Sequence, residues 1–250
     1  MKKTLISPIV AVMSLAVSTA ASAADIKVFC TNGVKAVVEE LIPRFERNSG
    51  DKVVLQFEPS TQLRKRIDAG EPFDLVIMTT TLVDEEIKAG KLSSDGRTFI
   101  AKSGLGVSIR AGAKKPNIAT VDAFKRALLD ADSITFAQQG ASAQPFEVLV
   151  AKLGITSQLR PKYNLRNTAA EVGDAVASGV VTLGIAPVSE ILPVRGVDLV
   201  GPFPKEVQSY VEMTGAVSVA ARQKDEAKKL LAFLAAPANV PVFTTKGMQR

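Results

Sequence analysis

The sequence predicts an α/β fold of two lobes joined by a hinge, and three observations predict it. Short apolar runs alternate with amphipathic runs along most of the chain. Two long extended runs lie near residues 99–110 and 210–221, and no repeat or flexible linker separates the parts. Such alternation is typical of parallel sheets with crossover helices. Two extended runs that each cross between lobes would form a hinge.

The first 23 residues have the pattern of a secretory signal peptide. Lys2 and Lys3 precede an apolar run at residues 5–17, and Ala-Ser-Ala at residues 21–23 is a suitable cleavage site. The apolar run is shorter than the roughly 20 residues that a bilayer requires. We therefore expect a periplasmic protein of 227 residues, after 23 are removed from 250. The single cysteine, Cys30, provides neither a lipid anchor at the cleavage point nor an internal disulfide.

The first part of the mature chain contains three predicted β-α pairs. The strands are expected at residues 26–30, 53–57 and 74–78, and the helices at residues 34–47, 61–70 and 82–92. Apolar, β-branched runs favour strands, and apolar residues at three- and four-residue spacing favour helices. In an open sheet of this kind, ligands bind at the carboxyl ends of the strands.

A second α/β series follows Lys102. Its strands are expected at residues 104–110, 133–137 and 181–187, and its helices at residues 120–132, 143–155 and 169–179. A strand at 211–221 and helices at 225–237 and 240–245 are expected to return to the first lobe. The predicted division is a signal peptide at 1–23, lobe 1 at 24–101 plus 212–250, and lobe 2 at 102–211. One continuous doubly wound domain is the alternative, because periodicity does not distinguish the two.

The composition excludes several kinds of site. Without histidine the chain has no Ser-His-Asp or Cys-His catalytic group, and one cysteine is too few for a cysteine-based zinc site. No phosphate-binding or dinucleotide-binding glycine motif is present. Loss of the two signal-peptide lysines lowers the formal charge from +6 to +4, and the basic residues are scattered. We therefore expect no metal, no cofactor and no nucleic-acid partner.

Small polar residues follow the first two predicted strands at the point where each strand ends. Thr31 and Asn32 follow the first strand, and Ser60 and Thr61 follow the second. A helix start has unpaired N–H groups and a partial positive charge, so it suits an anion. Capping alone explains any one such junction, and we assign only capping to Thr79–Thr81. Two junctions from adjacent strands predict one shared anion site.

Other residues extend this predicted site. Arg64 lies one turn into the second helix and is predicted to reach the ligand, with a solvated guanidinium as the equal alternative. Ser142 and Ala143 stand at a similar small-residue junction in lobe 2. Ser189 begins a short helix there and is a further candidate, although capping alone is the simpler interpretation. Cys30 receives no functional role.

Five motifs occur in order along the chain: VFCTNGVKAVVEELIPRFE, VVLQFEPSTQLRKRIDAGEPFDLVI, LGI at residues 153–155, VTLGIAPVSEILP and FLAAPANVPVFTTKGM. In this order they resemble the periplasmic molybdate-binding proteins, which are type II solute-binding components of ABC transporters. The resemblance covers essentially the whole mature chain. It implies the two-lobed type II periplasmic binding protein fold and an oxyanion held by hydroxyls and backbone N–H groups. The matching positions are Thr31, Asn32, Ser60, Thr61, Ala143 and Ser189.

The chain also departs from the molybdate-binding pattern. Thr31-Asn32-Gly33 replaces an Ala-Ser-Leu stretch, and Ser60-Thr61-Gln62 replaces a Ser-Ser-Gly stretch. Arg64 replaces a small residue, and no tyrosine stands near Ser189. The motifs QLRKRIDAGEPFD and SEILPV also resemble the periplasmic aconitate isomerases built on this fold. An organic carboxylate is therefore a second candidate ligand.

These observations lead to one hypothesis and two alternatives. The hypothesis is a monomeric periplasmic protein that closes over a small anion and presents it to the membrane permease of an ABC transporter. The first alternative is an isomerase that moves a proton on a tricarboxylate, with Glu58 or Glu190 as the proton carrier in the absence of histidine. The second alternative is the ligand domain of a DNA-binding regulator, which the predicted signal peptide disfavours.

Overall fold

The computed structural model describes residues 24–250, so the predicted signal peptide at residues 1–23 lies outside the described residues. The strands are β1 (Asp25–Thr31), β2 (Lys52–Glu58), β3 (Leu75–Thr79), β4 (Thr98–Arg110), β5 (Ile134–Thr135), β6 (Leu183–Pro187), β7 (Val197–Pro202) and β8 (Tyr210–Val217). They form one sheet in the order β2-β1-β3-β8-β4-β6-β5, with β7 also paired to β4. Strand β1 is parallel to β2 and β3, whereas β8 is antiparallel to β3 and β4.

Helices surround this sheet. The α-helices are α1 (Lys35–Ser49), α2 (Ser60–Asp68), α3 (Thr80–Lys88), α4 (Val121–Asp130), α5 (Ala143–Lys152), α6 (Thr156–Leu159), α7 (Ala169–Ala177), α8 (Val188–Ile191), α9 (Lys224–Leu234) and α10 (Val240–Thr245). The short 3-10 helices are η1 (Asn32–Val34), η2 (Arg160–Lys162), η3 (Lys205–Val207) and η4 (Pro237–Asn239). No helix within residues 24–250 combines the length and the apolar character that crossing a membrane requires.

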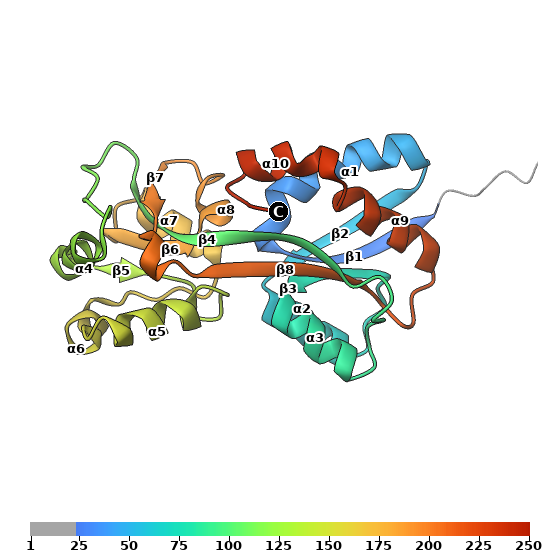
Figure 1. Ribbon diagram of the computed structural model, residues 1–250, viewed down its shortest axis with the longest axis horizontal. Helices are drawn as coiled ribbons and strands as arrows, with labels where there is room; N and C mark the ends of the chain where they lie inside the picture. The colour runs from blue at the N-terminus through green and yellow to red at the C-terminus, as the bar shows by residue number, and fades with distance from the viewer. Residues whose placement is uncertain (1–23) are drawn as a thin grey trace, which may run out of the picture.

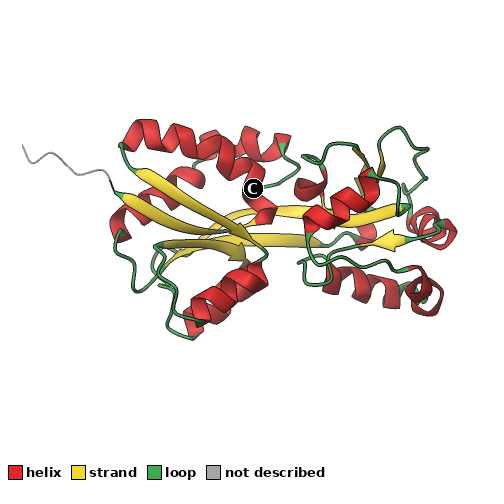
Figure 2. Ribbon diagram, turned by 180° about the vertical axis from the view of Figure 1, so that it is seen from behind, coloured by secondary structure: helices red, strands yellow, loops and turns green. Residues whose placement is uncertain are grey.

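The molecule is elongated, with an α/β half at each end of its long axis (Figure 1). The first half contains β1 to β3, α1 to α3 and α9, and the second half contains β5 to β7 and α4 to α8. Helices lie on both faces of the strands in the first half (Figure 2). This arrangement confirms the predicted α/β fold with two parts. The predicted lobe boundaries at 101/102 and 211/212 stay a prediction.

Strands β4 and β8 run between the two halves (Figure 1). Residues 98–104 of β4 pair with β8, whereas residues 105–110 pair with β6 and β7. The change of partner occurs at Leu105, whose N–H and C=O both bond to the side chain of Gln208. A single strand therefore belongs to the sheet of both halves, as the extended run near residues 99–110 of the sequence predicted.

The returning C-terminal segment completes the first half. Helix α1 buries Val37, Leu41 and Phe45, a spacing of four residues that places them on one face. Phe45 contacts Phe233 of α9 with ring centroids 5.5 Å apart. Gly50 ends α1 in a left-handed conformation (φ 82°) that glycine adopts without steric cost. Helix α9 thus packs against α1 of the first half.

Two strands differ from the sequence prediction. The strand expected at residues 133–137 is reduced to β5, which has two residues, because the chain beyond it makes only an isolated bridge at Ala137 before it turns toward α5. Strand β7 was not predicted, since its six residues lie between Gly196 and a proline-rich turn and show no alternation. Pairing with β4 stabilises β7, and such pairing is not visible in the local sequence.

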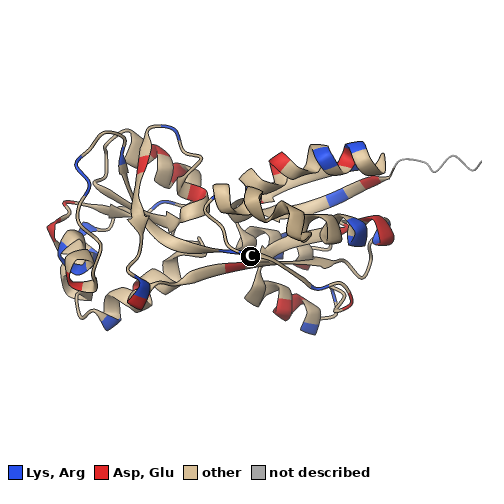
Figure 3. Cartoon of the chain, turned by 45° about the horizontal axis from the view of Figure 1, so that its top comes forward, with Lys and Arg blue, Asp and Glu red and all other residues tan. Residues whose placement is uncertain are grey.

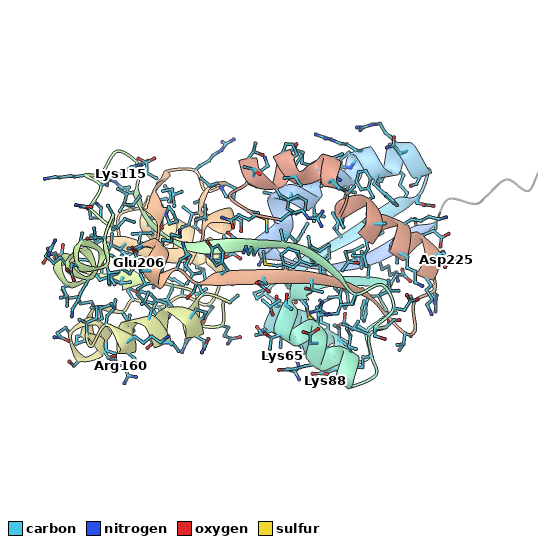
Figure 4. All side chains as sticks on the ribbon, in the orientation of Figure 1. Lys65, Lys88, Lys115, Arg160, Glu206 and Asp225 are labelled. Carbon is cyan, nitrogen blue, oxygen red and sulfur yellow. The ribbon has the colours of Figure 1, made fainter. Side chains whose placement is uncertain are left out.

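Charged residues of both signs occur along the helices of both halves (Figure 3). Lys65 of α2 and Lys88 of α3 are exposed, and their side chains point away from the body of the molecule (Figure 4). These two lysine side chains are thus directed to solvent.

Candidate functional site

Two hydroxyl groups meet where β1 and β2 end. These strands are parallel neighbours with Thr31 opposite Glu58, so the residues after each strand lie at the same edge of the sheet. The Ser60 hydroxyl donates a hydrogen bond to Thr31 Oγ1 at 3.1 Å and accepts one from the N–H of Thr79 at 3.1 Å. Thr31 and Ser60 are each 7% exposed. Ser60 therefore connects the ends of three strands and leaves the Thr31 O–H proton available to a ligand.

A small cavity lies beside these hydroxyls, between the two halves. Its volume is about 30 Å³, which suits a group of a few atoms. The first half contributes Thr31, Asn32, Pro59 and Ser60, and the second half contributes Ala137, Gly140, Ala141, Asn167, Thr168, Ala169 and Glu190. No lysine or arginine is among these lining residues. An anion bound here would be held by neutral donors.

Two helices of nine residues begin at this cavity from opposite sides. Helix α2 begins at Ser60, and α7 begins at Ala169, just after Thr168. The Thr168 hydroxyl accepts from the N–H of Glu171 at 3.2 Å and so caps α7. The N–H groups of the first turn of a helix lack intrahelical partners and carry partial positive charge. Both halves therefore offer dipoles that favour a negative group in the cavity.

Glu190 is the one acidic residue that lines the cavity. It lies on α8, which packs against η1, and a Cβ added to Gly33 would lie 3.6 Å from its Oε1. The residue is partly buried, and burial raises the pKa of its carboxyl to about 7. No hydrogen bond or ion pair to this carboxylate is present among residues 24–250. Near neutral pH the cavity therefore contains a group that is about half protonated.

A larger cavity of about 400 Å³ shares Gly140 and Ala141 with the small one. Its other lining residues are Thr79, Thr80, Thr81, Gln144, Pro145, Tyr210, Val211 and Glu212. The expectation that Thr79–Thr81 only cap a helix is corrected. The Thr79 side chain makes no capping hydrogen bond, and Thr80 instead pairs its hydroxyl with that of Thr214 at 2.8 Å. The three threonines thus present hydroxyls beside the candidate site.

The structure does not bring Arg64 to the cavity, so the expectation that it reaches the ligand is corrected. Its guanidinium lies 2.5 Å from Glu85 and 3.1 Å from Glu86, both on α3, and 3.9 Å from Asp68. Glu86 is only 1% exposed and needs a cationic partner. Three acidic groups thus hold Arg64 between α2 and α3. Glu58 is likewise paired with Arg66 at 3.1 Å and does not line the cavity.

Four other predicted residues are also absent from the lining of the small cavity: Thr61, Ser142, Ala143 and Ser189. Thr61 is exposed, one position past the buried Ser60. Ser142 is buried, and Ala143 turns its N–H to the carbonyl of Gly140. The N–H of Ser189 donates to Ser103 Oγ at 3.1 Å. The predicted contacts are absent because Thr61 faces the solvent. Ser142 and Ser189 are buried in the protein, and Ala143 packs against the core.

Asn167 and Thr168 line the cavity but were not predicted as site residues. Thr168 and Glu171 have the spacing of a capping box, in which a threonine and a glutamate three residues later satisfy the first N–H groups of a helix. In the structure Glu171 Oε2 accepts from the N–H of Asn167 at 2.9 Å. The capping-box spacing indicates where α7 begins. The three-dimensional structure is needed to show that this helix start lines the cavity.

One side-chain contact joins the halves near the cavity. Gln62 of α2 donates through Nε2 to Oε1 of Gln139 at 3.1 Å, although the two residues are 77 positions apart. Gln139 lies in the loop before α5 whose Gly140 and Ala141 line both cavities. The hydrogen bond therefore holds the loop of the second half against the first half.

Residues 26–249 match the family described as bacterial extracellular solute-binding protein. The chain belongs to this family. This solute-binding protein is 26% identical over 227 residues to an aconitate isomerase of Pseudomonas sp, covering 89% of the chain and 86% of that relative. It is 25% identical over 176 residues to the molybdate-binding protein ModA of Azotobacter vinelandii, covering 69% and 68%.

The fold of the solute-binding protein is shared with a solved relative. The periplasmic molybdate-binding protein of Azotobacter vinelandii superposes with a TM-score of 0.74 at 17% identity, over 90% of this chain and 99% of that one. This confirms the periplasmic binding protein fold and the resemblance to the molybdate-binding proteins. Both families named by the resemblance are therefore among the relatives of this solute-binding protein.

Proposed function

We propose that this protein binds a small anion in the cavity between its halves and delivers it to the membrane permease of an ABC transporter. The observation that carries the proposal is the lining of the cavity. Buried hydroxyls of Thr31 and Ser60 lie with the helix start at Thr168 around a space that no lysine or arginine of residues 24–250 lines. Neutral donors and helix dipoles stabilise an anion in such a space without an opposite charge.

Two features bear on the kind of anion. Neutral donors and a volume of about 30 Å³ suit one oxyanion or one carboxylate group. The adjoining cavity of about 400 Å³ has room for the rest of an organic anion, and its hydroxyl groups on Thr79, Thr80 and Tyr210 suit a polar molecule. A molybdate-type oxyanion would occupy the small cavity alone, whereas a multivalent carboxylate would extend into the larger one.

Closure of the two halves follows from the same geometry. Donors from both halves are satisfied together only when the ligand bridges them, so binding shifts the protein toward the closed form. The Gln62–Gln139 hydrogen bond also stabilises the closed form. A permease that recognises the closed form would then distinguish loaded from empty protein. We propose that the protein acts as a monomer in the periplasm.

Titration calorimetry tests the proposal with molybdate, tungstate, sulfate, citrate and cis- and trans-aconitate. At least one anion should bind with 1:1 stoichiometry, and Ser60→Ala should weaken that binding. Thr61→Ala is the matched control, because this neighbouring hydroxyl is exposed and outside the cavity. The absence of binding by every anion of the panel would overturn the proposal.

A second candidate function is an isomerase, and the position of Glu190 favours it. A carboxyl with a pKa of about 7 that lines the cavity has the proton affinity of a general base near neutral pH. It would take a proton from one carbon of a tricarboxylate and return it to another carbon, so the reaction needs no further reactant. The aconitate isomerase relative, at 26% identity, is consistent with this chemistry.

Incubation with trans-aconitate separates the two functions. A binding protein leaves the compound unchanged in a proton NMR spectrum. Formation of the cis isomer, abolished in Glu190→Gln and retained in Glu206→Gln, would establish the isomerase. Glu206 is exposed on η3 in the second half (Figure 4) and does not line the cavity.

A further inference from the structure

We propose that Glu190 binds the anion as a neutral carboxylic acid, so that each anion bound above neutral pH brings one proton into the site. This inference rests on the proposed function. It goes beyond that function because it makes Glu190 a specificity residue for ligand oxygens that accept a hydrogen bond. It also makes anion affinity depend on pH.

The geometry places Glu190 against any anion in the small cavity. The cavity has room for only a few atoms, and Glu190 lines it together with Thr31, Ser60 and Thr168. A ligand oxygen that contacts the two hydroxyls is therefore within a few ångströms of the Glu190 carboxyl. An ionised carboxylate at such a distance repels an anion, whereas a protonated one donates a hydrogen bond to it.

No neighbouring cation compensates a negative charge on Glu190 within the described chain. Helix α8 packs against β4, β6, β7 and η1, and the turn after α10 contacts Val188. Neither β6 nor η1 carries a charged residue. The charged groups on or beside the remaining elements are engaged elsewhere or exposed. Lys102 lies over the Tyr210 ring, Lys35 pairs with Glu39, Lys246 pairs with Glu40, and Asp198 accepts from Gly112. Arg110, at the end of β4, and Arg195, in the turn between α8 and β7, are both exposed.

The pKa of Glu190 is already raised in the protein without a bound anion. Burial alone raises the pKa of Glu190 to about 7, with no contribution from a charged neighbour. A bound anion raises that pKa further, because a like charge disfavours the ionised form. Below about pH 7 the carboxyl is already protonated and binding takes up no proton. Above about pH 7 binding takes up one proton, and affinity falls about tenfold per pH unit.

Calorimetry in two buffers with different ionisation enthalpies tests this inference. Molybdate and trans-aconitate serve as probes, since both are fully ionised at about pH 8. Wild type is expected to take up about one proton per anion at that pH and to lose about tenfold in affinity for each pH unit above about 7. Glu190→Gln should take up none and bind with nearly constant affinity. Glu206→Gln, an exposed acid outside the site, should behave as wild type.

The outcomes separate this inference from the proposed function. Binding without proton uptake in wild type, or with equal uptake in Glu190→Gln, overturns the inference and leaves the proposed function intact. If neither molybdate nor trans-aconitate binds wild type or Glu190→Gln at any pH, the inference is overturned for these anions. The proposed function is overturned only if the rest of the anion panel also fails to bind. Proton uptake onto Glu190 also argues against the isomerase, because a protonated carboxyl in the complex cannot act as the base.

Discussion

The hydroxyl of Ser60 has two partners that a mutation would leave unsatisfied. It accepts from the Thr79 N–H and donates to Thr31 Oγ1, both at 3.1 Å. Ser60→Ala should lower the free energy of unfolding by about 1–3 kcal/mol, because a buried N–H then lacks an acceptor. It should also weaken anion binding about tenfold or more, since Thr31 loses the bond that orients its hydroxyl. Urea unfolding and calorimetry measure the two effects.

Thr61→Ala is the matched control for this prediction. The two hydroxyls are adjacent in sequence, but Thr61 is exposed and outside the cavity. Its removal should change stability by less than about 0.5 kcal/mol and affinity by less than about twofold. If Thr61→Ala matched Ser60→Ala in either measurement, the assignment of Ser60 would be wrong.

The raised pKa of Glu190 predicts that the stability of the protein depends on pH. Its pKa in the folded protein, about 7, lies above the usual value of 4.5, so the fold favours the protonated form. The stability that Glu190 contributes is fully present below about pH 4.5 and is lost as the pH rises to about 7. Glu190→Gln cannot ionise, so its melting temperature should exceed that of wild type at about pH 8.5 by on the order of 10 degrees. The difference reflects on the order of 3 kcal/mol, the free energy that corresponds to a pKa of about 7 in place of 4.5.

At about pH 4.5 the same two proteins should melt within about a degree of each other, because both then carry a neutral side chain. Glu206→Gln should show no pH-dependent difference from wild type, since this side chain is exposed and lies outside the cavity. Thermal melts at the two pH values provide the measurement. An equal difference between wild type and Glu190→Gln at both pH values would contradict the burial of the Glu190 carboxyl.

The local sequence predicted part of the candidate site at the level of residues. Thr31 and Ser60 were predicted because they follow adjacent parallel strands, which a β-α-β pattern indicates directly. Arg64 was placed at the site from its own helix alone. Its partners Glu85 and Glu86 lie on another helix, and contacts between two helices cannot be predicted from the local sequence pattern. Thr168 was missed for the same reason.

At the level of elements, Arg64 joins α2 to α3. Its Nε lies 3.1 Å from Glu86 Oε1, and the only other cation near Glu86 is Lys91 at 3.5 Å among the described residues. Arg64→Ala should therefore lower the free energy of unfolding by about 1–3 kcal/mol, because a buried carboxylate loses one of two partners. Anion affinity should stay within about twofold of wild type. A tenfold loss of affinity without a loss of stability would instead place Arg64 at the ligand.

The contact between α2 and the loop before α5 also belongs to this level. Gln62→Ala removes the hydrogen bond to Gln139 that joins the halves. The closed form should lose about 0.5–1 kcal/mol, which weakens anion binding about two- to fivefold. Stopped-flow mixing should show the effect mainly as faster dissociation of the anion. Gln138→Ala is the control, because this exposed side chain has no hydrogen bond within residues 24–250.

Long helices and buried strands were the elements that the sequence predicted best. Helix α10 was predicted at residues 240–245, where the structure has it, and α1, α4 and α9 differ only at their ends. Strand β7 was missed because an edge element depends on pairing with β4 and not on its own pattern. The expected strand at 133–137 was too long because its apolar side chains are buried without a full ladder.

At the level of the whole molecule, β4 and β8 determine how the halves move. Strand β4 is continuous through the junction and changes partners at Leu105, where Gln208 and Ser209 bond to its backbone. Strand β8 begins at this junction, with Tyr210 opposite Gly104. The halves can therefore rotate about a paired, ordered hinge and cannot drift apart. The extended run near residues 99–110 predicted this connection. The run near residues 210–221 does not cross as a strand, since β8 pairs only with β3 and with residues 98–104 of β4.

Closure around the anion predicts a change in shape. The free protein in solution should sample more open arrangements, since the donors of the cavity are then solvated, and a bound anion should shift the population to the closed form. Small-angle X-ray scattering should show a smaller radius of gyration with saturating anion than without it. Ser60→Ala, which binds weakly, should show the smaller value only at higher anion concentrations. An unchanged radius in wild type would contradict ligand-driven closure.

The proposed position of the anion is between the halves, on the hydroxyls at the ends of β1 and β2. A crystal structure with the anion that binds most tightly in the calorimetric panel would locate it. Ligand oxygens should lie about 3 Å from Thr31 Oγ1 and Ser60 Oγ, with Glu190 and the start of α7 on the opposite side. An anion bound elsewhere on the molecule, with both hydroxyls untouched, would contradict it.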